Sequence, residues 1–191
     1  MARSINGGYL EYPLIENHHE SGILDFSLIP ARAPSSLKEE ATKLAMKIAS
    51  DLNYIGVMAI EFFISSNRLY VNEIAPRPHN SGHFSIDACG YNQFDQQVLA
   101  LAGNELKNEA TKFPISVMLN LLGDLWFRSG EQLEPKFEMI AGPGISLHLY
   151  GKAEPRIGRK MGHITVLGLK NKSQEDVMEK TETIRKILWE N

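Results

Sequence analysis

A pair of apolar runs around a short polar break constrains this fold more than any other feature. The runs are residues 56–64 and 68–74, and the break is Ser65-Ser66-Asn67. Both runs are rich in β-branched and aromatic residues, a pattern typical of two antiparallel strands joined by a tight turn. The sequence therefore predicts a β-hairpin in the first half of the chain.

The predicted hairpin ends in a segment that cannot continue as a strand. Residues 75–83 read Ala-Pro-Arg-Pro-His-Asn-Ser-Gly-His. Pro76 and Pro78 lack backbone N–H donors and have a fixed φ angle, so a rigid loop is expected at the end of the second strand. Loops held on a rigid scaffold often carry functional residues.

Two strands and two helices are expected around this hairpin. Apolar β-prone runs at 9–15 and 23–29 indicate strands, with the polar run 16–22 as their loop. Apolar residues spaced by three and four after Ser36 predict a helix over about 36–52 with a serine cap. A second helix is expected over 93–101, because Ala102-Gly103-Asn104 is a typical helix end.

The pattern changes after Phe113. Short strands are expected at 115–122, 145–150 and 163–167, and Ser173 to Asp176 forms a capping box before a final helix. One face of that helix would carry Val177, Thr181, Ile184 and Leu188. We therefore expect an α+β fold with one domain over residues 1–103 and a small β-rich module with a final helix over 113–191.

Composition excludes several classes of protein. A hydrophobic content of 43% can form a core, and the net charge of −3 creates no global field for a nucleic acid. The single cysteine, Cys89, cannot form an internal disulfide and is expected to be a small buried residue. No apolar run reaches the roughly 18 to 20 residues needed to cross a bilayer. We expect a cytoplasmic protein with neither nucleic-acid nor membrane partners.

The hairpin carries two glutamates whose relation depends on the turn. A loop of three or five residues would place Glu61 opposite Glu73, whereas a two-residue loop would place it opposite Asn72. Facing carboxylates repel unless a cation lies between them, and Mg²⁺ is a hard cation that carboxylate oxygens bind. The alternative is a solvated sheet face.

The neighbouring loop adds polar groups beside this pair. Arg77 and Asn80 follow Glu73 by four and seven residues, which suggests a site for a nucleotide and a metal. His79 and His83 have a spacing seen in zinc sites, but the prolines disfavour the helix that would align them. A role in the loop is preferred for both histidines.

A second cluster of charge lies near the end of the chain. Four cations, at Lys152, Arg156, Arg159 and Lys160, fall within nine residues that also contain glycine and proline. Such a loop suits a phosphate group. The alternative is a solvated basic turn.

Four stretches of the chain together resemble one enzyme family. Residues 72–83 are similar to the signature of ATP-grasp enzymes, and in particular of the 5-(carboxyamino)imidazole ribonucleotide synthetases of purine biosynthesis. The other matching stretches are residues 12–17 with 22–24, residues 116–123, and residues 151–163. The resemblance covers nearly the whole chain.

This resemblance implies a reaction and a set of roles. ATP would activate bicarbonate to carboxyphosphate, whose carboxyl group passes to the amine of aminoimidazole ribonucleotide. It implies Mg²⁺ ligation by Glu61 and Glu73, with Asn80 at the metal and the phosphates of ATP. Arg77 and His79 would be catalytic, facing the intermediate or the substrate. The ribonucleotide phosphate would be held by Lys152, Arg156, Arg159 and Lys160.

The resemblance also has departures. The family's substrate domain and the first half of its ATP-grasp domain have no counterpart here, so residues 1–103 would be the C-terminal half of that domain. The chain is expected to need the missing N-terminal half as a partner, to be inactive alone, and to form a homodimer by analogy. Gln97 and Leu99 stand where the family usually has His and Arg, so a ligand contact through that arginine is absent.

Two other functions stay open at this point. The chain could derive from another ATP-grasp carboxylase or from the formate-using glycinamide ribonucleotide transformylase, which share the proline loop in outline. It could also be a non-catalytic fragment that acts as a binding or dimerisation module.

Overall fold

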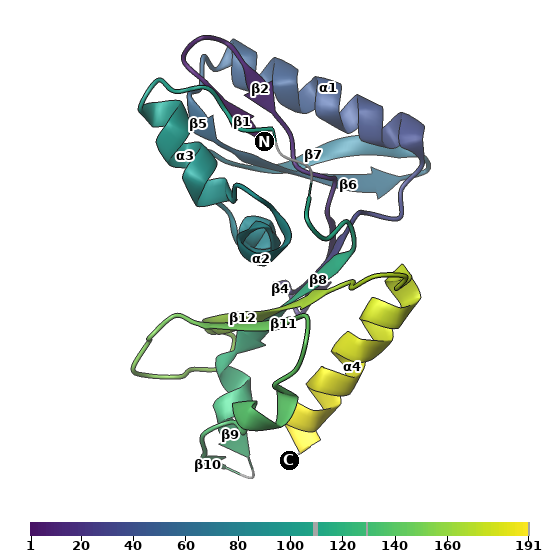
Figure 1. Cartoon of the computed structure of the whole chain (residues 1–191), viewed down its shortest axis with the longest axis vertical. Helices are drawn as coiled ribbons and strands as arrows, with labels where there is room; N and C mark the ends of the chain where they lie inside the picture. The colour runs from purple at the N-terminus through teal and green to yellow at the C-terminus, as the bar shows by residue number, and fades with distance from the viewer. Residues whose placement is uncertain (109–110, 129, 191) are drawn as a thin grey trace. The chain divides into compact units, whose positions relative to one another are not determined.

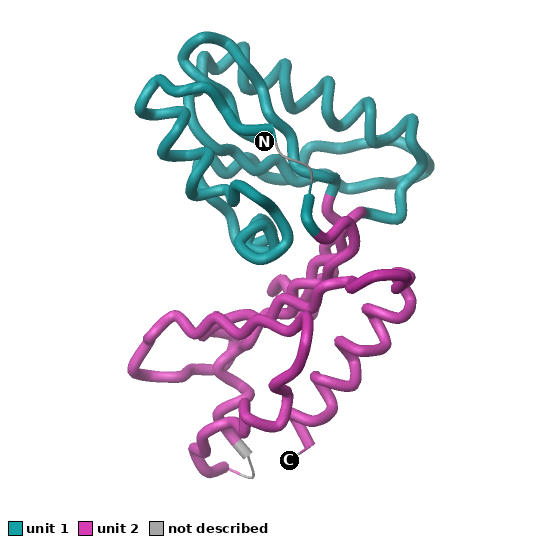
Figure 2. Tube along the Cα trace, viewed as in Figure 1, with its two compact units in different colours: residues 1–14, 31–112 teal, residues 15–30, 113–191 magenta. Residues whose placement is uncertain are grey.

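The computed structural model describes residues 1–108, 111–128 and 130–190. These form two compact units, the first made of residues 1–14 and 31–112 and the second of residues 15–30 and 113–191 (Figures 1 and 2). All strand pairs within the described residues are antiparallel and helices accompany both units, so the expected α+β class is confirmed. The units are not consecutive in the chain, because residues 15–30 leave the first unit and join the second.

The first unit combines a small sheet, a hairpin and helices. Its three-stranded sheet has the order β2-β1-β5, and the hairpin consists of β6 and β7. The element bounds are β1 Ala2–Arg3, β2 Tyr9–Leu10, α1 Ser35–Asp51, β5 Gly56–Val57, β6 Ala59–Ser65, β7 Arg68–Ala75, the 3₁₀ helix η1 Asn80–Phe84, α2 Ser85–Ala88 and α3 Gln93–Leu101.

The predicted helices of this unit form, but one predicted cap does not. Helix α1 begins at Ser35 with Pro34 at its N-cap, and no side chain caps it by a hydrogen bond. Helix α3 has the predicted bounds, and a capping box between Asn92 and Asp95 fixes its start. The expected strand over 9–15 is confined to β2 at Tyr9–Leu10.

The second unit is a five-stranded sheet with the order β11-β12-β8-β4-β3 and a long C-terminal helix. Its main bounds are β3 Glu16–Glu20, β4 Ile23–Ile29, β8 Ser116–Leu122, β11 Ile145–Leu149, β12 Lys160–Leu167 and α4 Gln174–Glu190. Shorter elements between them are η2 Gly123–Trp126, β9 Phe127–Arg128, β10 Glu131–Gln132 and η3 Phe137–Ile140.

Strand β3 corrects the prediction of a loop over residues 16–22. It pairs with β4 through a tight turn in which Ser21 and Gly22 have φ angles of 50° and 77°. β3 lies at the edge of the sheet, and an edge strand tolerates the polar sequence Glu-Asn-His-His-Glu because water reaches its side chains. Polarity alone therefore gave the wrong structure.

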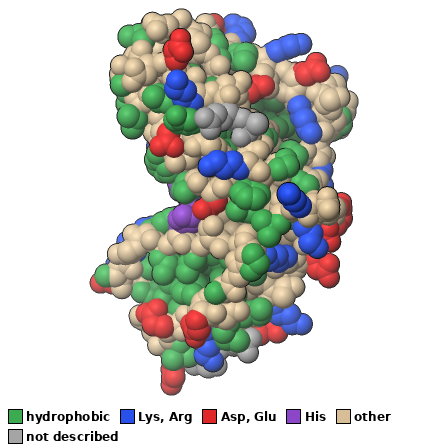
Figure 3. Space-filling view, in the orientation of Figure 1, with side chains coloured by type: hydrophobic (Ala, Val, Ile, Leu, Met, Phe, Trp, Pro, Cys, Tyr) green, Lys and Arg blue, Asp and Glu red, His purple; other side chains and the backbone are tan. Residues whose placement is uncertain are grey.

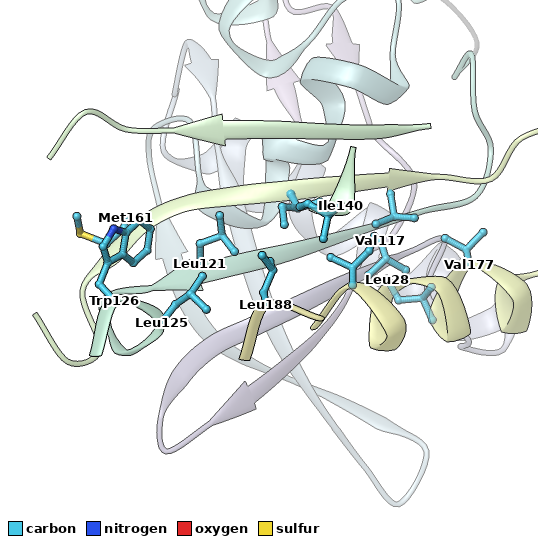
Figure 4. Packing of buried hydrophobic residues seen from close by; sticks show 12 residues of the cluster. Leu28, Val117, Leu121, Leu125, Trp126, Ile140, Met161, Val177 and Leu188 are labelled. Atoms are coloured by element: carbon cyan, nitrogen blue, oxygen red, sulfur yellow. The ribbon is translucent and has the colours of Figure 1, made fainter. Parts of the chain in front are cut away.

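The core of the second unit lies between the sheet and α4. Apolar side chains of the sheet meet the buried face of α4, as Figure 4 shows for Leu28, Val117, Leu121, Val177 and Leu188. The buried face of the helix is the predicted one, since Val177, Thr181, Ile184 and Leu188 are all buried. The predicted capping box also forms, because the Asp176 amide donates to Ser173 Oγ and the Ser173 amide donates to Asp176 Oδ2.

An ion pair supports the same contact at the rim of this core. Arg185 of α4 donates two hydrogen bonds to the carboxylate of Asp25 on β4, at 2.9 and 2.7 Å.

Among the helices that the structure describes, none is both long enough and apolar enough to cross a lipid bilayer.

Candidate functional site

The two hairpin glutamates face each other because of a β-bulge. The turn has only two residues, Ser66 and Asn67, with positive φ angles of 49° and 58°, and Ser65 pairs directly with Arg68. This register alone would set Glu61 against Asn72. The ladder instead shifts by one residue between Glu61 and Phe62, so that Glu61 pairs with Glu73. Both alternatives from the sequence are thus partly realised.

Asn72 is the extra residue of this bulge and stays close to the glutamates. Its side-chain Nδ2 lies 3.4 Å from Glu61 Oε2. Because opposed residues of a ladder project from the same face, both carboxylates lie on one side of the hairpin. The arrangement brings together two carboxylates, whose oxygens are ligands for a hard divalent cation.

The proline loop brings His79 to the same carboxylate. His79 Nε2 lies 3.9 Å from Glu61 Oε1, and the side chains are only 14% and 16% exposed, respectively. On the other side of the ring, His79 Nδ1 lies 2.9 Å from Ser81 Oγ. Two residues expected in the site from the sequence are therefore adjacent, with the imidazole contacted at both nitrogens.

Arg77 and Asn80 occupy the same loop. The Arg77 side chain is exposed and donates to the carbonyl oxygen of its neighbour Pro78 at 3.1 Å. Asn80 is half-buried and begins the 3₁₀ helix η1. The exposed Arg77 guanidinium is thus two residues before His79, and the half-buried Asn80 amide is one residue after it.

Three glutamines of α3 hold backbone groups inside the first unit, and sequence reasoning missed their role. Gln93 and Gln96 are 2% and 1% exposed, while Phe94, Val98 and Leu101 on the opposite face are exposed. Gln96 binds both backbone groups of the segment after α3, donating to the Lys107 carbonyl oxygen and accepting from the Lys107 amide. Polar side chains lie on the buried face of this helix and apolar side chains on its exposed face. This pattern could have indicated that the glutamines form hydrogen bonds to buried backbone groups.

Gln97 stands at one of the two departures from the family pattern. Its Oε1 accepts a hydrogen bond of 2.6 Å from the Val57 amide. A Cβ atom at Gly56, where φ is +125°, would lie 2.9 Å from the same oxygen. Glycine at 56 therefore allows the close approach of Gln97, which ties α3 to strand β5.

The basic loop of the second unit is more ordered than a solvated turn. Lys152 Nζ donates to the Lys160 carbonyl oxygen and lies over the ring of Tyr150, 5.4 Å from its centre. Arg159 donates to the Glu154 carbonyl oxygen at 2.7 Å, and Arg156 pairs with the Glu154 carboxylate at 2.7 Å. Glu154 thus balances part of the charge, which counting cations in the sequence did not reveal.

The loop is anchored to the start of the short helix η2. The Gly158 amide donates to Asp124 Oδ2 at 2.8 Å, and the Gly123 amide donates to the Arg159 carbonyl oxygen at 2.8 Å. A Cβ atom at Gly123 would lie 2.1 Å from the Arg156 carbonyl oxygen, so only glycine fits there. Three of the four cations belong to this loop and Lys160 is the first residue of β12, with Lys152 and Arg156 exposed and Arg159 and Lys160 half-buried.

One face of the molecule shows side chains of both charges. On the face seen in Figure 3, basic and acidic side chains are interspersed over both units. This agrees with the small net charge of the sequence.

Comparison with known families decides the identity of the fold. The model of the ATP-grasp domain matches residues 1–94, the part that holds the paired glutamates and the proline loop. The model of the phosphoribosylaminoimidazole carboxylase C-terminal domain matches residues 116–179. Residues 1–94 therefore belong to an ATP-grasp domain. The resemblance seen in the sequence is therefore confirmed.

Individual relatives of this chain carry the same enzyme name. The N5-carboxyaminoimidazole ribonucleotide synthase of Staphylococcus aureus strain COL is 44% identical over 184 residues, which are 95% of this chain and 47% of that protein. The synthetase structure from Thermus thermophilus superposes with a TM-score of 0.85 at 36% identity, covering 97% of this chain and 48% of that one.

Several solved relatives contain a bound nucleotide, and one of them also contains the ribonucleotide. The synthase of Aspergillus clavatus, in complex with ADP and 5-aminoimidazole ribonucleotide, has a TM-score of 0.78 and 28% identity, covering 93% of this chain and 47% of that one. The chain spans about half the length of the relatives it matches.

Proposed function

We propose that this chain forms the carboxyl-terminal part of an ATP-dependent ligase of purine biosynthesis that makes 5-(carboxyamino)imidazole ribonucleotide. The substrates would be ATP, bicarbonate and aminoimidazole ribonucleotide. The observation that carries the proposal is the bulged pairing of Glu61 with Glu73 beside His79, within a chain that matches such synthases over 95% of its length.

The paired glutamates fit a magnesium site. They lie on one face of the hairpin, and two carboxylates in this arrangement repel unless a cation is shared. Mg²⁺ bound by Glu61 and Glu73 would neutralise charge on the phosphates of ATP. Asn80 would donate its amide to those phosphates from the start of η1.

The proline loop would act on the carboxyl donor. In the proposed reaction a bicarbonate oxygen attacks the γ-phosphorus of ATP with loss of ADP, and the substrate amine then attacks the carboxyl carbon with loss of phosphate. The Arg77 guanidinium suits the anionic carboxyphosphate, since its planar donors match carboxylate and phosphate oxygens. His79, held between Ser81 and Glu61, would place its imidazole at the same site.

The basic loop would bind the ribonucleotide phosphate. Lys152, Arg156, Arg159 and Lys160 lie on one anchored segment, and Asp124 and Gly123 hold its backbone. A loop fixed in this way presents cations without having to order first when the phosphate binds. Homodimer formation remains a prediction of the resemblance, and a cytoplasmic location remains a prediction from the composition.

A chimera tests the proposed function. The amino-terminal half of the S. aureus relative would be joined in register before residue 1, because this chain alone spans only about half of that protein. The chimera should consume ATP and incorporate labelled bicarbonate only when aminoimidazole ribonucleotide is present. The chain without that half should show no turnover.

Other outcomes of this assay would contradict the proposal. A folded chimera that uses glycinamide ribonucleotide and formate, and ignores aminoimidazole ribonucleotide, would favour the transformylase. A folded chimera that binds ATP without any ligase activity would favour a non-catalytic module.

A further inference from the structure

Gln93 makes an unusual set of contacts beneath the proline loop. Its Oε1 accepts a hydrogen bond of 2.8 Å from the His79 amide, and its Nε2 donates one of 2.8 Å to the His79 carbonyl oxygen. The side-chain amide thus binds both backbone groups of one residue, as a neighbouring strand would. Since Gln93 is 2% exposed, these bonds are shielded from water.

These two bonds fix which end of the Gln93 amide is oxygen. The His79 N–H can only donate and the His79 carbonyl can only accept, so a flipped amide would lose both bonds. The second hydrogen of Nε2 is then directed at His83 Nδ1, 2.8 Å away. Because an amide nitrogen cannot accept, His83 Nδ1 must be the acceptor, and the neutral ring carries its proton on Nε2.

We infer that Gln93 is a positioning residue that holds the His79 peptide and keeps His83 in the Nε2–H tautomer. The contacts of Gln93 do not depend on the proposed function. Only the use we assign to them, which is to keep the His79 imidazole beside Glu61, rests on that function. Gln93 itself reaches no group that the proposed reaction would change.

The surroundings of Gln93 are built for this role. A Cβ atom at Gly82 would lie 2.5 Å from Gln93 Oε1, so glycine at 82 leaves room for the amide. The Gln93 backbone amide donates to Ser85 Oγ at 3.1 Å, and Ser85 Oγ donates to the Gly82 carbonyl oxygen at 2.6 Å. The helix start and the loop are therefore joined by backbone and side chain together.

Nuclear magnetic resonance of the full chain with ¹⁵N-labelled histidine tests the tautomer. In the wild-type chain, the His83 ring should show its proton on Nε2. Gln93→Glu keeps an acceptor for the His79 amide but has no hydrogen to donate. Its carboxylate should therefore draw a proton to His83 Nδ1, either as the other tautomer or as an imidazolium ion. Gln97→Glu, the same change on the same helix, keeps its acceptor for Val57 and should leave the His83 spectrum unchanged.

Hydrogen exchange provides a second readout. Gln93→Met removes the acceptor for the His79 amide, so that amide should exchange roughly tenfold faster or more. Gln97→Met should leave the exchange rate at His79 unaltered.

The inference is wrong if the wild-type His83 ring carries its proton on Nδ1, a result that needs no variant to fold. It is also wrong if a folded Gln93→Glu chain keeps the wild-type His83 spectrum. Neither result depends on turnover, so an inactive chimera would overturn the proposed function and leave this inference standing.

Discussion

At the scale of single residues, burial is the main influence on the chemistry of Cys89. Cys89 is 6% exposed, and loss of hydration raises the pKa of its thiol from 9.0 to about 11, partly offset by the positive charge of Lys112. At neutral pH the group is therefore a protonated thiol, which is a poor nucleophile. Cys89 serves as a small core residue, as its sequence context predicted.

The raised pKa predicts that Cys89 reacts slowly with thiol reagents. At pH 8 the folded chain should be alkylated by iodoacetamide at least tenfold more slowly than the same chain in guanidinium, which serves as the control. Because the folded pKa is raised, the associated stability is present below pH 9 and is lost as the pH rises toward 11. Equal rates for folded and unfolded chains would show that the thiol is accessible and ionised.

The bulge at Asn72 shows what residue-level reasoning could and could not predict. The hairpin and its polar break follow from the sequence, but the turn length does not, because only the structure shows a two-residue turn at Ser66 and Asn67. The extra residue of the bulge has no signal in the sequence, because Asn72 lies within the run 68–74 that predicts a continuous strand. The pairing of Glu61 with Glu73 therefore required the structure, as did the contacts of Gln93 across fourteen residues.

At the scale of elements, periodicity predicted helices better than polarity predicted loops. The buried face of α4 follows directly from the spacing of Val177, Thr181, Ile184 and Leu188. Strand β3 was missed because its stability comes from the backbone ladder to β4 rather than from apolar side chains. An edge strand with polar side chains has no apolar signal to detect.

The Asp25–Arg185 ion pair predicts a measurable link between α4 and β4. The two side chains are 17% and 23% exposed, so Arg185→Met leaves a partly buried carboxylate without its two donors. We expect a loss of about 1 to 3 kcal/mol in the free energy of unfolding of the second unit. Tryptophan fluorescence in urea can report it, since Trp126 and Trp189 are both in that unit.

The matched control is Lys172→Met, two residues before the first residue of α4. Lys172 pairs with Asp176 at 3.6 Å, and the two side chains are 56% and 41% exposed. Exposed pairs of this kind contribute little, so stability should change by less than about 1 kcal/mol. Equal losses in the free energy of unfolding for both variants would show that the Asp25–Arg185 pair stabilises the unit no more than an exposed pair does.

The basic loop predicts a selective effect on one substrate. In the chimera, Lys152→Ala and Arg159→Ala should each raise the KM for aminoimidazole ribonucleotide roughly ten- to hundredfold, because each removes a charge-assisted hydrogen bond to phosphate. The KM for ATP should stay nearly unchanged, and Lys136→Ala, outside the loop, is the control. A rise in the KM for ATP with the ribonucleotide spared would assign the loop to the nucleotide.

At the scale of the whole molecule, the path of the chain differs from the order of its family matches. The two family models follow one another along the sequence. The compact units do not, because residues 15–30 lie within the range of the first model but belong to the second unit. Sequence reasoning predicted consecutive domains because composition changes only once, near residue 113. The strand pair β3–β4 joins the second unit through backbone pairing of β4 with β8, which composition does not encode.

The central claim is that the bulged glutamate pair serves an ATP-dependent carboxylation. The most direct measurement is the turnover of the chimera with ATP, bicarbonate and aminoimidazole ribonucleotide, compared between wild type, Glu73→Gln and the control Glu40→Gln on the exposed face of α1. Glu73→Gln keeps the size of the side chain and removes its charge. We predict that it lowers turnover by roughly a hundredfold or more while Glu40→Gln stays at the wild-type rate. A Glu73→Gln chimera with near-normal turnover would contradict the claim.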